Sequence, residues 1–275
     1  MRGLKSVFDF YLNSSIHVAL AVVAMTWVTL LDFEIEDSTI LWFNFFATIT
    51  GYNFVKYFGL AKFHHRSLAN WLQVIQIFSA ISFLVLIYFT LKLNGETIMY
   101  LVIFGLITFF YAIPVLPKSY FLNQEKNLRS ISGFKIYVIA FVWSCSTVII
   151  PLINNEISVS NEVLIVALQR FLIVLVWILP FEIRDIKYDS IKLSTLPQKI
   201  GILQAKIAGT LMTVLFFGLN FFRSDINYSE MFVLFLISLI SIGFLVFSKK
   251  HQDEYYSSFW VEAIPIYWLI IAIVF

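Results

Sequence analysis

Residues 163–189, VLIVALQRFLIVLVWILPFEIRDIKYD, pass from an almost entirely apolar stretch into a charged one. The apolar part approaches the roughly 20 residues that an α-helix needs to cross a bilayer. The charged part carries Glu182, Asp185 and Asp189, which lie three and four residues apart and therefore share one face of a helix. Carboxylates at the mouth of an apolar helix are costly unless they bind something, and a divalent metal holding a phosphate is the obvious candidate.

The composition places the whole chain in a membrane. Hydrophobic residues make up 60% of its 275 residues, whereas soluble domains are close to half apolar. Its 30 Phe, 13 Tyr and 7 Trp suit lipid-facing and interfacial positions. The single cysteine, Cys145, excludes a disulfide within the chain and a thiolate cluster. No cleavable signal peptide is evident before the first apolar run.

Apolar runs predict an all-α, polytopic membrane protein with one transmembrane domain, residues 1–275. We expect nine spans, at Ser14–Leu31, Ile40–Leu60, Trp71–Leu91, Ile98–Leu116, Phe134–Ile153, Val163–Pro180, Gln204–Phe222, Met231–Phe247 and Phe259–Phe275.

The charges of the predicted loops alternate in sign along the chain. One set of loops is basic, with Lys62, Arg66, Lys118, Lys126, Arg129, Lys187, Lys192, Lys199, Lys249 and Lys250. The other set is acidic, with Asp32, Glu34, Glu36, Asp37, Glu96, Glu156, Glu162, Asp225 and Glu230 against only Lys92 and Arg223. The positive-inside rule therefore predicts a cytoplasmic N-terminus and carboxylate motif, and an outer C-terminus. We expect a bacterial inner membrane as the location.

The residues RDIKYD (184–189), followed by TLP (195–197) and IG (200–201), resemble the second aspartate motif of the UbiA superfamily of intramembrane prenyltransferases. The resemblance extends to YAIP (111–114), which is similar to the end of the family's fourth helix. It also includes NLRSISGFK (127–135), which is similar to the family's basic loop. It thus covers most of the chain.

This resemblance implies nine transmembrane helices around a central cavity open to the cytoplasmic side. It implies Mg²⁺ held by Asp185 and Asp189, with Glu182 either a third ligand or the partner of a neighbouring arginine. It also implies a diphosphate site built from Asn53, Arg129, Lys135 and Arg184.

The segment GYNFVKYFGLA (51–61) departs from the family's first motif, which reads Asn-x-x-x-Asp-x-x-x-Asp. Asn53 fits that pattern, but Tyr57 and Ala61 stand where aspartates are expected. Lys56 precedes the first missing aspartate, and a lysine ammonium can contact a phosphate oxygen directly. We therefore expect Lys56 to replace one metal ion, which leaves a single Mg²⁺ on the second motif.

Each of these residues also has a simpler interpretation. Lys56 can snorkel to the membrane interface, and Asp185 and Asp189 can be neutralised by neighbouring basic residues as a helix end. Arg170 lies inside a predicted span and must face a partner or a cavity. His17 can merely bond a neighbour, and Glu262 stands where the family tends to carry an acidic residue.

The predicted function is transfer of a prenyl group from a polyprenyl diphosphate to an aromatic or other lipophilic acceptor, with no nucleic-acid partner. A terpene cyclase on the same scaffold would need the same residues. A non-catalytic protein that binds or moves an isoprenoid lipid is the second class, favoured by the missing aspartates. An unrelated transporter is the third, although no interrupted helices recur in the two halves. Prenyl chain length, acceptor and oligomeric state are not predicted.

Overall fold

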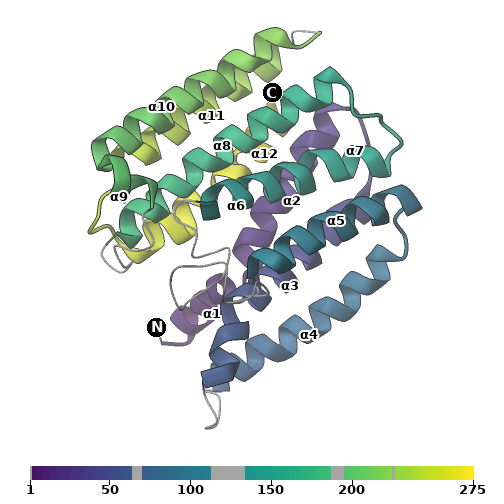
Figure 1. Cartoon of the computed structure of the whole chain (residues 1–275), viewed down its shortest axis with the longest axis vertical. Helices are drawn as coiled ribbons and strands as arrows, with labels where there is room; N and C mark the ends of the chain where they lie inside the picture. Colours follow the sequence, from purple (N-terminus) through teal and green to yellow (C-terminus); the bar gives the residue numbers. More distant parts are fainter. Residues whose placement is uncertain (1, 64–69, 113–133, 187–194, 225–226) are drawn as a thin grey trace, which may run out of the picture.

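The computed structural model describes residues 2–63, 70–112, 134–186, 195–224 and 227–275, which contain helices and no strand. Figure 1 shows these helices packed as a single bundle. Their bounds are α1 (Arg2–Asn13), α2 (Ile16–Asp32), α3 (Ser38–Phe63), α4 (Asn70–Thr90), α5 (Gly95–Ala112), α6 (Phe134–Ser144), η3 (Cys145–Ile149), α7 (Ile150–Asn154), α8 (Asn161–Asp185), α9 (Leu196–Ile200), α10 (Ile202–Gly218), η5 (Leu219–Phe222), α11 (Tyr228–Phe247), η6 (Tyr256–Val261) and α12 (Ile264–Val274).

The chain is an all-helical, multi-pass membrane protein. Within the described residues, six helices are long and apolar enough to cross a bilayer, or seven if α1 and α2, bent by 56° at their junction, form one span. A helix occupies each of the nine predicted ranges in the described part of the chain, but α3 and α5 do not reach the same length and apolarity there. The prediction of nine crossings is therefore not confirmed.

Helix α8 forms the centre of the bundle, between α6, α10 and α11 (Figure 1). In its most apolar stretch 61% of the residues are inside the protein, against 17% for α4 and 22% for α10. Its side chains Ile173, Leu179 and Ile183 are completely or almost completely buried. The apolar run that predicted a membrane span is thus also the core of the protein, and α4 and α10 face lipid.

Polar side chains join helices inside the apolar core. The Asn44 amide on α3 donates to Thr26 Oγ1 at 2.8 Å and to the Ser146 carbonyl at 2.9 Å. That carbonyl is available because the η3 segment is a π-helix, in which Ile150 N–H bonds Cys145 instead. A polar pair in this environment has no water as an alternative partner, so such bonds hold helices together.

Arg170 on α8 has the partners that the sequence could not name. It is 2% exposed, and its Nη1 and Nη2 donate to the Met25 carbonyl at 2.7 Å and to Thr29 Oγ1 at 3.1 Å. Its guanidinium lies 4.8 Å from the ring centroid of Trp268. These contacts tie α8 to α2 and α12 within the described structure.

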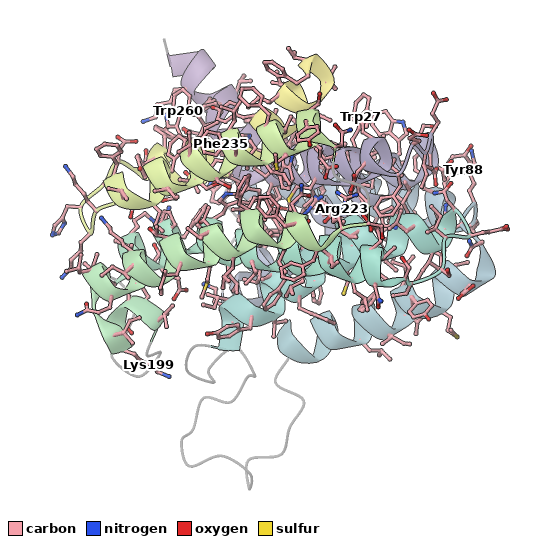
Figure 2. The ribbon with its side chains drawn as sticks, turned by 90° about the horizontal axis from the view of Figure 1, so that it is seen from above. Trp27, Tyr88, Lys199, Arg223, Phe235 and Trp260 are labelled. Atoms are coloured by element: carbon pink, nitrogen blue, oxygen red, sulfur yellow. The ribbon has the colours of Figure 1, made fainter. Side chains whose placement is uncertain are left out.

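A second arginine, Arg223, joins α2, α8 and α11 at the end of the bundle where α2 ends. It pairs with Asp32 at 2.8 Å, with Glu162 at 2.5 Å and with Glu230. Burial alone lowers the pKa of Arg223, but these carboxylates raise it above its ordinary value, so the side chain stays charged. Figure 2 shows Arg223 between the helices, whereas exposed aromatic residues such as Trp260 lie on the outside. We call this group the Arg223 clamp.

Candidate functional site

The predicted site residues of the described structure gather at the other end of the bundle, which we call the motif end. Here α2 and α6 begin, α3 and α8 end, and η6 leads into α12. Side-chain bonds between these elements show that the ends meet: Ser15 bonds Asn53, Lys135 pairs with Glu182, and His17 bonds Phe259. Asp189 and Arg129 lie outside the described residues.

Glu182, predicted as a metal ligand or a partner of a basic residue, is 3% exposed and faces α6. The Lys135 ammonium lies 3.9 Å from its Oε1. Lys135 itself is half-exposed, so it can reach both this carboxylate and an anion at the motif end. Lys135 and Glu182, both predicted as site residues, therefore form an ion pair.

Arg184 and Asp185 form an ion pair between neighbours at the end of α8. Arg184 Nε donates to one Asp185 oxygen at 2.7 Å and Nη2 to the other at 3.3 Å. Both side chains are less than one-third exposed. The helix-end ion pair is thus present, and a metal at Asp185 would have to share this carboxylate with Arg184.

The described carboxylates do not form a metal centre by themselves. No group of three His, Cys, Asp or Glu suited to a metal ion exists among the residues that the structure describes. Glu182 and Asp185 each already face a cation. A Mg²⁺ site would depend on Asp189, four residues beyond Asp185 in the sequence.

Glu262, which directly follows η6, is under the electrostatic influence of two of the predicted cations. It interacts electrostatically with Lys56 on α3 and with Arg184 on α8. Neither cation comes within 4.0 Å of it in the described structure, so the three charges converge without forming a close ion pair. Lys56 remains exposed and Glu262 half-buried, although the surrounding protein desolvates both.

The first-motif residues of α3 hold the corner between α1 and α2. Asn53 is 2% exposed; its amide donates to the Ser14 carbonyl at 3.0 Å and to Ser79 Oγ at 2.8 Å. Its carbonyl oxygen accepts from Ser15 Oγ at 2.8 Å. Tyr57, at the position of a missing aspartate, donates to the Asn13 carbonyl at 2.8 Å. Asn53 thus has its amide hydrogens engaged within the protein.

The corner between α1 and α2 contains a backbone conformation that residues other than glycine rarely adopt. Ser15 has a φ of 64°, in the left-handed region that favours glycine. The hydrogen bond from Ser15 Oγ to Asn53 stabilises that conformation and fixes the direction of α1. We call the contacts of Asn53 and Tyr57 with residues 13–15 the corner brace.

Helix α1, which the sequence did not reveal as a structured element, docks across the motif end (Figure 1). Phe8 packs against Phe259 at 5.2 Å between ring centroids, and Phe10 packs against Phe78 of α4 at 5.8 Å. Tyr255 donates to Asp9 at 3.2 Å, and partial burial together with this carboxylate raises the pKa of Tyr255 to about 12. Helix α1 therefore bridges the two sides of the bundle.

Docking of α1 brings Tyr11 against His17. Tyr11 Oη lies 2.6 Å from His17 Nδ1, and His17 Nε2 lies 2.9 Å from the Phe259 carbonyl oxygen. Tyr11 also interacts electrostatically with Glu262. The prediction that His17 bonds a neighbour therefore understated its surroundings. Its only signal in the sequence was an ionisable residue just inside an apolar run.

No protein-family model and no curated protein sequence matches this chain. Its fold is similar to a solved structure of a digeranylgeranylglyceryl phosphate synthase in membranes, with a TM-score of 0.57 and 17% sequence identity. The likeness covers 100% of this chain and 98% of that one. At this identity the likeness extends to the fold, and substrates and site residues have to be argued from this chain's own side chains.

Proposed function

We propose that this protein transfers a prenyl group from a polyprenyl diphosphate to an aromatic or other lipophilic acceptor, as a divergent UbiA-like prenyltransferase. The observation that carries the proposal is the convergence of Lys56 and Arg184 around Glu262 at the motif end. Among the described residues Lys56 forms no ion pair within 4.0 Å and is available to an anionic ligand, whereas Arg184 would be shared between that ligand and Asp185. The sequence resemblance and the likeness in fold to a membrane lipid synthase support the same class of reaction.

Prenyl transfer requires an allylic carbon–oxygen bond to break, with the electron pair leaving on the diphosphate. In this proposal Lys56, Arg184 and Lys135 bind that diphosphate and stabilise its growing negative charge, as does Arg129 by the resemblance, while Asn53 positions the site through its hydrogen bonds within the protein. The apolar interior between the helices would exclude water from the allylic cation.

Mg²⁺ is part of the proposal, with Asp185 and Asp189 as its ligands and Glu182 as a further candidate. When bound, it would add positive charge beside the leaving diphosphate. Arg184 would then support the metal-bound Asp185 through the ion pair already formed. We place this site on the cytoplasmic side of a bacterial inner membrane, by the loop charges.

A second candidate is a non-catalytic protein that binds or moves an isoprenoid lipid. It is favoured by the corner brace, because Asn53 and Tyr57 serve a structural purpose where the family has metal-binding chemistry. A terpene cyclase would share the ionising residues of the main proposal and would differ only in lacking an external acceptor.

The test is pyrophosphate release by the purified, detergent-solubilised protein. Geranyl, farnesyl and geranylgeranyl diphosphates would each be offered with Mg²⁺ or with EDTA. We expect Mg²⁺-dependent release that is lost in the double variant Asp185→Asn/Asp189→Asn. Binding of these donors without release would favour the lipid-binding protein, and cyclic hydrocarbon products would identify a cyclase.

A further inference from the structure

The hydrogen bonds of His17 determine where its proton lies. The Phe259 carbonyl can only accept, so His17 Nε2 must carry a hydrogen to bond it at 2.9 Å. In the neutral ring Nδ1 is then an acceptor, and the Tyr11 hydroxyl must be the donor of the 2.6 Å bond to it. Tyr11 therefore directs its proton at an imidazole nitrogen that can receive it.

The surroundings hold this pair rigidly. His17 is 2% exposed, and its ring stacks on Phe259 at 4.9 Å with an interplanar angle of 21°. The corner brace fixes the chain between Tyr11 and His17. Phe259 belongs to η6, a π-helical segment, and such segments often occur at functional sites.

The pair lies close to the charges that carry the proposed function, because His17 bonds and stacks on Phe259, three residues before Glu262. Glu262 interacts electrostatically with Tyr11 as well as with Lys56 and Arg184. Tyr11 is half-buried, and its hydroxyl hydrogen is directed to His17. Among the described charged groups, Glu262 at the η6–α12 junction therefore acts on Tyr11. Lys56 and Arg184 act in turn on Glu262.

Building on the proposed prenyl transfer, we infer that Tyr11 and His17 form the proton acceptor for a hydroxyl-bearing acceptor substrate. The carbon–oxygen bond to the diphosphate would break first, and the acceptor's oxygen would then form a bond to the allylic cation, so that ionisation of the donor does not depend on the proton acceptor. The acceptor's hydroxyl proton moves to Tyr11 Oη while the Tyr11 proton moves to His17 Nδ1. The products are an ether, pyrophosphate and one proton, which the imidazolium releases to water. This arrangement links a nucleophile (the acceptor hydroxyl), a base (Tyr11 with His17) and an orienting group (the Phe259 carbonyl), as in other hydroxyl-activating sites.

Glu262 has a supporting part in this inference. A carboxylate near Tyr11 opposes a permanent negative charge on the phenol oxygen, because like charges repel. Tyr11 would therefore pass the proton on to His17 in the same step rather than ionise alone. The imidazolium formed is a short-lived cation in the field of this carboxylate.

The test separates donor ionisation from transfer to the acceptor. Tyr11→Phe removes one hydroxyl and retains the ring that packs on Phe8. Tyr256→Phe is the matched control, because its hydroxyl bonds the Phe244 carbonyl at 2.7 Å away from the pair. Both variants and the wild type would receive a radiolabelled prenyl diphosphate with dodecanol or nonylphenol, and pyrophosphate and ether would be measured together.

We expect Tyr11→Phe to form ether at least about 100-fold more slowly, with pyrophosphate release within about twofold of wild type. Tyr256→Phe should change neither. Equal losses of ether and pyrophosphate in Tyr11→Phe would overturn the inference, and so would attachment of the prenyl group to carbon or wild-type pyrophosphate release without any ether. Absence of pyrophosphate release from the wild type would instead count against the proposed function.

A measurement independent of turnover checks the pair itself. Nitrogen-15 NMR of the histidine rings, with His17→Gln for assignment, should show His17 Nδ1 unprotonated and shifted by loss of the Tyr11 hydroxyl. A protonated Nδ1 in the resting protein would overturn the inference whatever the enzyme assay shows.

Discussion

The two ends of the bundle use their charges in opposite ways. In the Arg223 clamp a single arginine, 8% exposed, is in direct contact with three carboxylates from three helices. At the motif end Lys56, Arg184 and Glu262 act on one another electrostatically, and Glu262 forms no ion pair within 4.0 Å among the described residues. The clamp arginine is engaged by three carboxylates, whereas the described part of the motif end holds Lys56 without a close ion pair.

This contrast separates structural charges from candidate ligand-binding charges. Buried charges that serve stability are expected to be fully paired, because an unpaired one is strongly destabilising. Ionisable groups inside a membrane protein that lack such pairing usually mark a functional site. Removing a charge should therefore lower stability at the clamp and lower ligand affinity at the motif end.

Arg223→Met removes the positive charge at the centre of the clamp and should cause the largest loss of stability. Loss of the arginine leaves Asp32, Glu162 and Glu230 facing one another, which should lower the free energy of unfolding by about 3–5 kcal/mol. Denaturation followed by tryptophan fluorescence would measure this. Lys92→Met is the matched control, because the Lys92 ammonium lies over the rings of Tyr88 and Phe89 and should contribute much less. Equal losses in the two variants would contradict the clamp.

Asn53→Ala tests the corner brace at the motif end. Its hydrogen bonds to Ser14, Ser15 and Ser79 would be lost, which should cost about 1–3 kcal/mol. Helix α1 should also loosen, as measured by the mobility of a spin label on Ser6→Cys in a Cys145→Ala background. Asn44→Ala, an equally buried asparagine of α3, should lose similar stability without mobilising the label. Equal label mobility in the two variants would rule out the brace.

Tyr255→Phe should have the smallest effect, since it removes the hydroxyl that bonds Asp9 and retains the ring that packs against Phe8. The pKa of Tyr255 is raised to about 12 from an ordinary value of about 10, so the bond contributes fully below about pH 10 and is lost as the pH rises through about 12. The alkaline absorbance titration of wild type minus Tyr255→Phe should show one phenol ionising near pH 12. Ionisation near pH 10 would mean that α1 is not docked there.

The helical membrane architecture could be predicted from the sequence because a bilayer demands long apolar segments, and such segments are visible locally. The pairing of Arg184 with Asp185 could be predicted for the same reason, because the two residues are neighbours in the sequence. The number of membrane crossings was harder to predict, because α3 carries polar residues such as Asn44 and Asn53 that bond other parts of the protein.

The contacts that could not be predicted join residues far apart in the chain. His17 and Phe259 are separated by 242 positions, and Arg170 and Met25 by 145. No periodic pattern in the sequence encodes such a pair. The sequence therefore predicted neither the partners of the buried Arg170 nor the docking of α1. Tyr57 illustrates the same limit: its sequence position marks a missing aspartate, and only the fold shows its bond to Asn13.

The most direct test of the contrast between the two ends is equilibrium binding of unreactive prenyl thiodiphosphates to Lys56→Ala. Geranyl, farnesyl and geranylgeranyl forms would be titrated into wild type, Lys56→Ala and Lys250→Ala, the last replacing an exposed lysine of the α11–η6 connection. We predict that Lys56→Ala weakens binding at least about tenfold, the worth of one charge-assisted contact, while Lys250→Ala binds as wild type does. Unchanged affinity in Lys56→Ala would show that the motif-end lysine only snorkels to the interface, and would contradict the account.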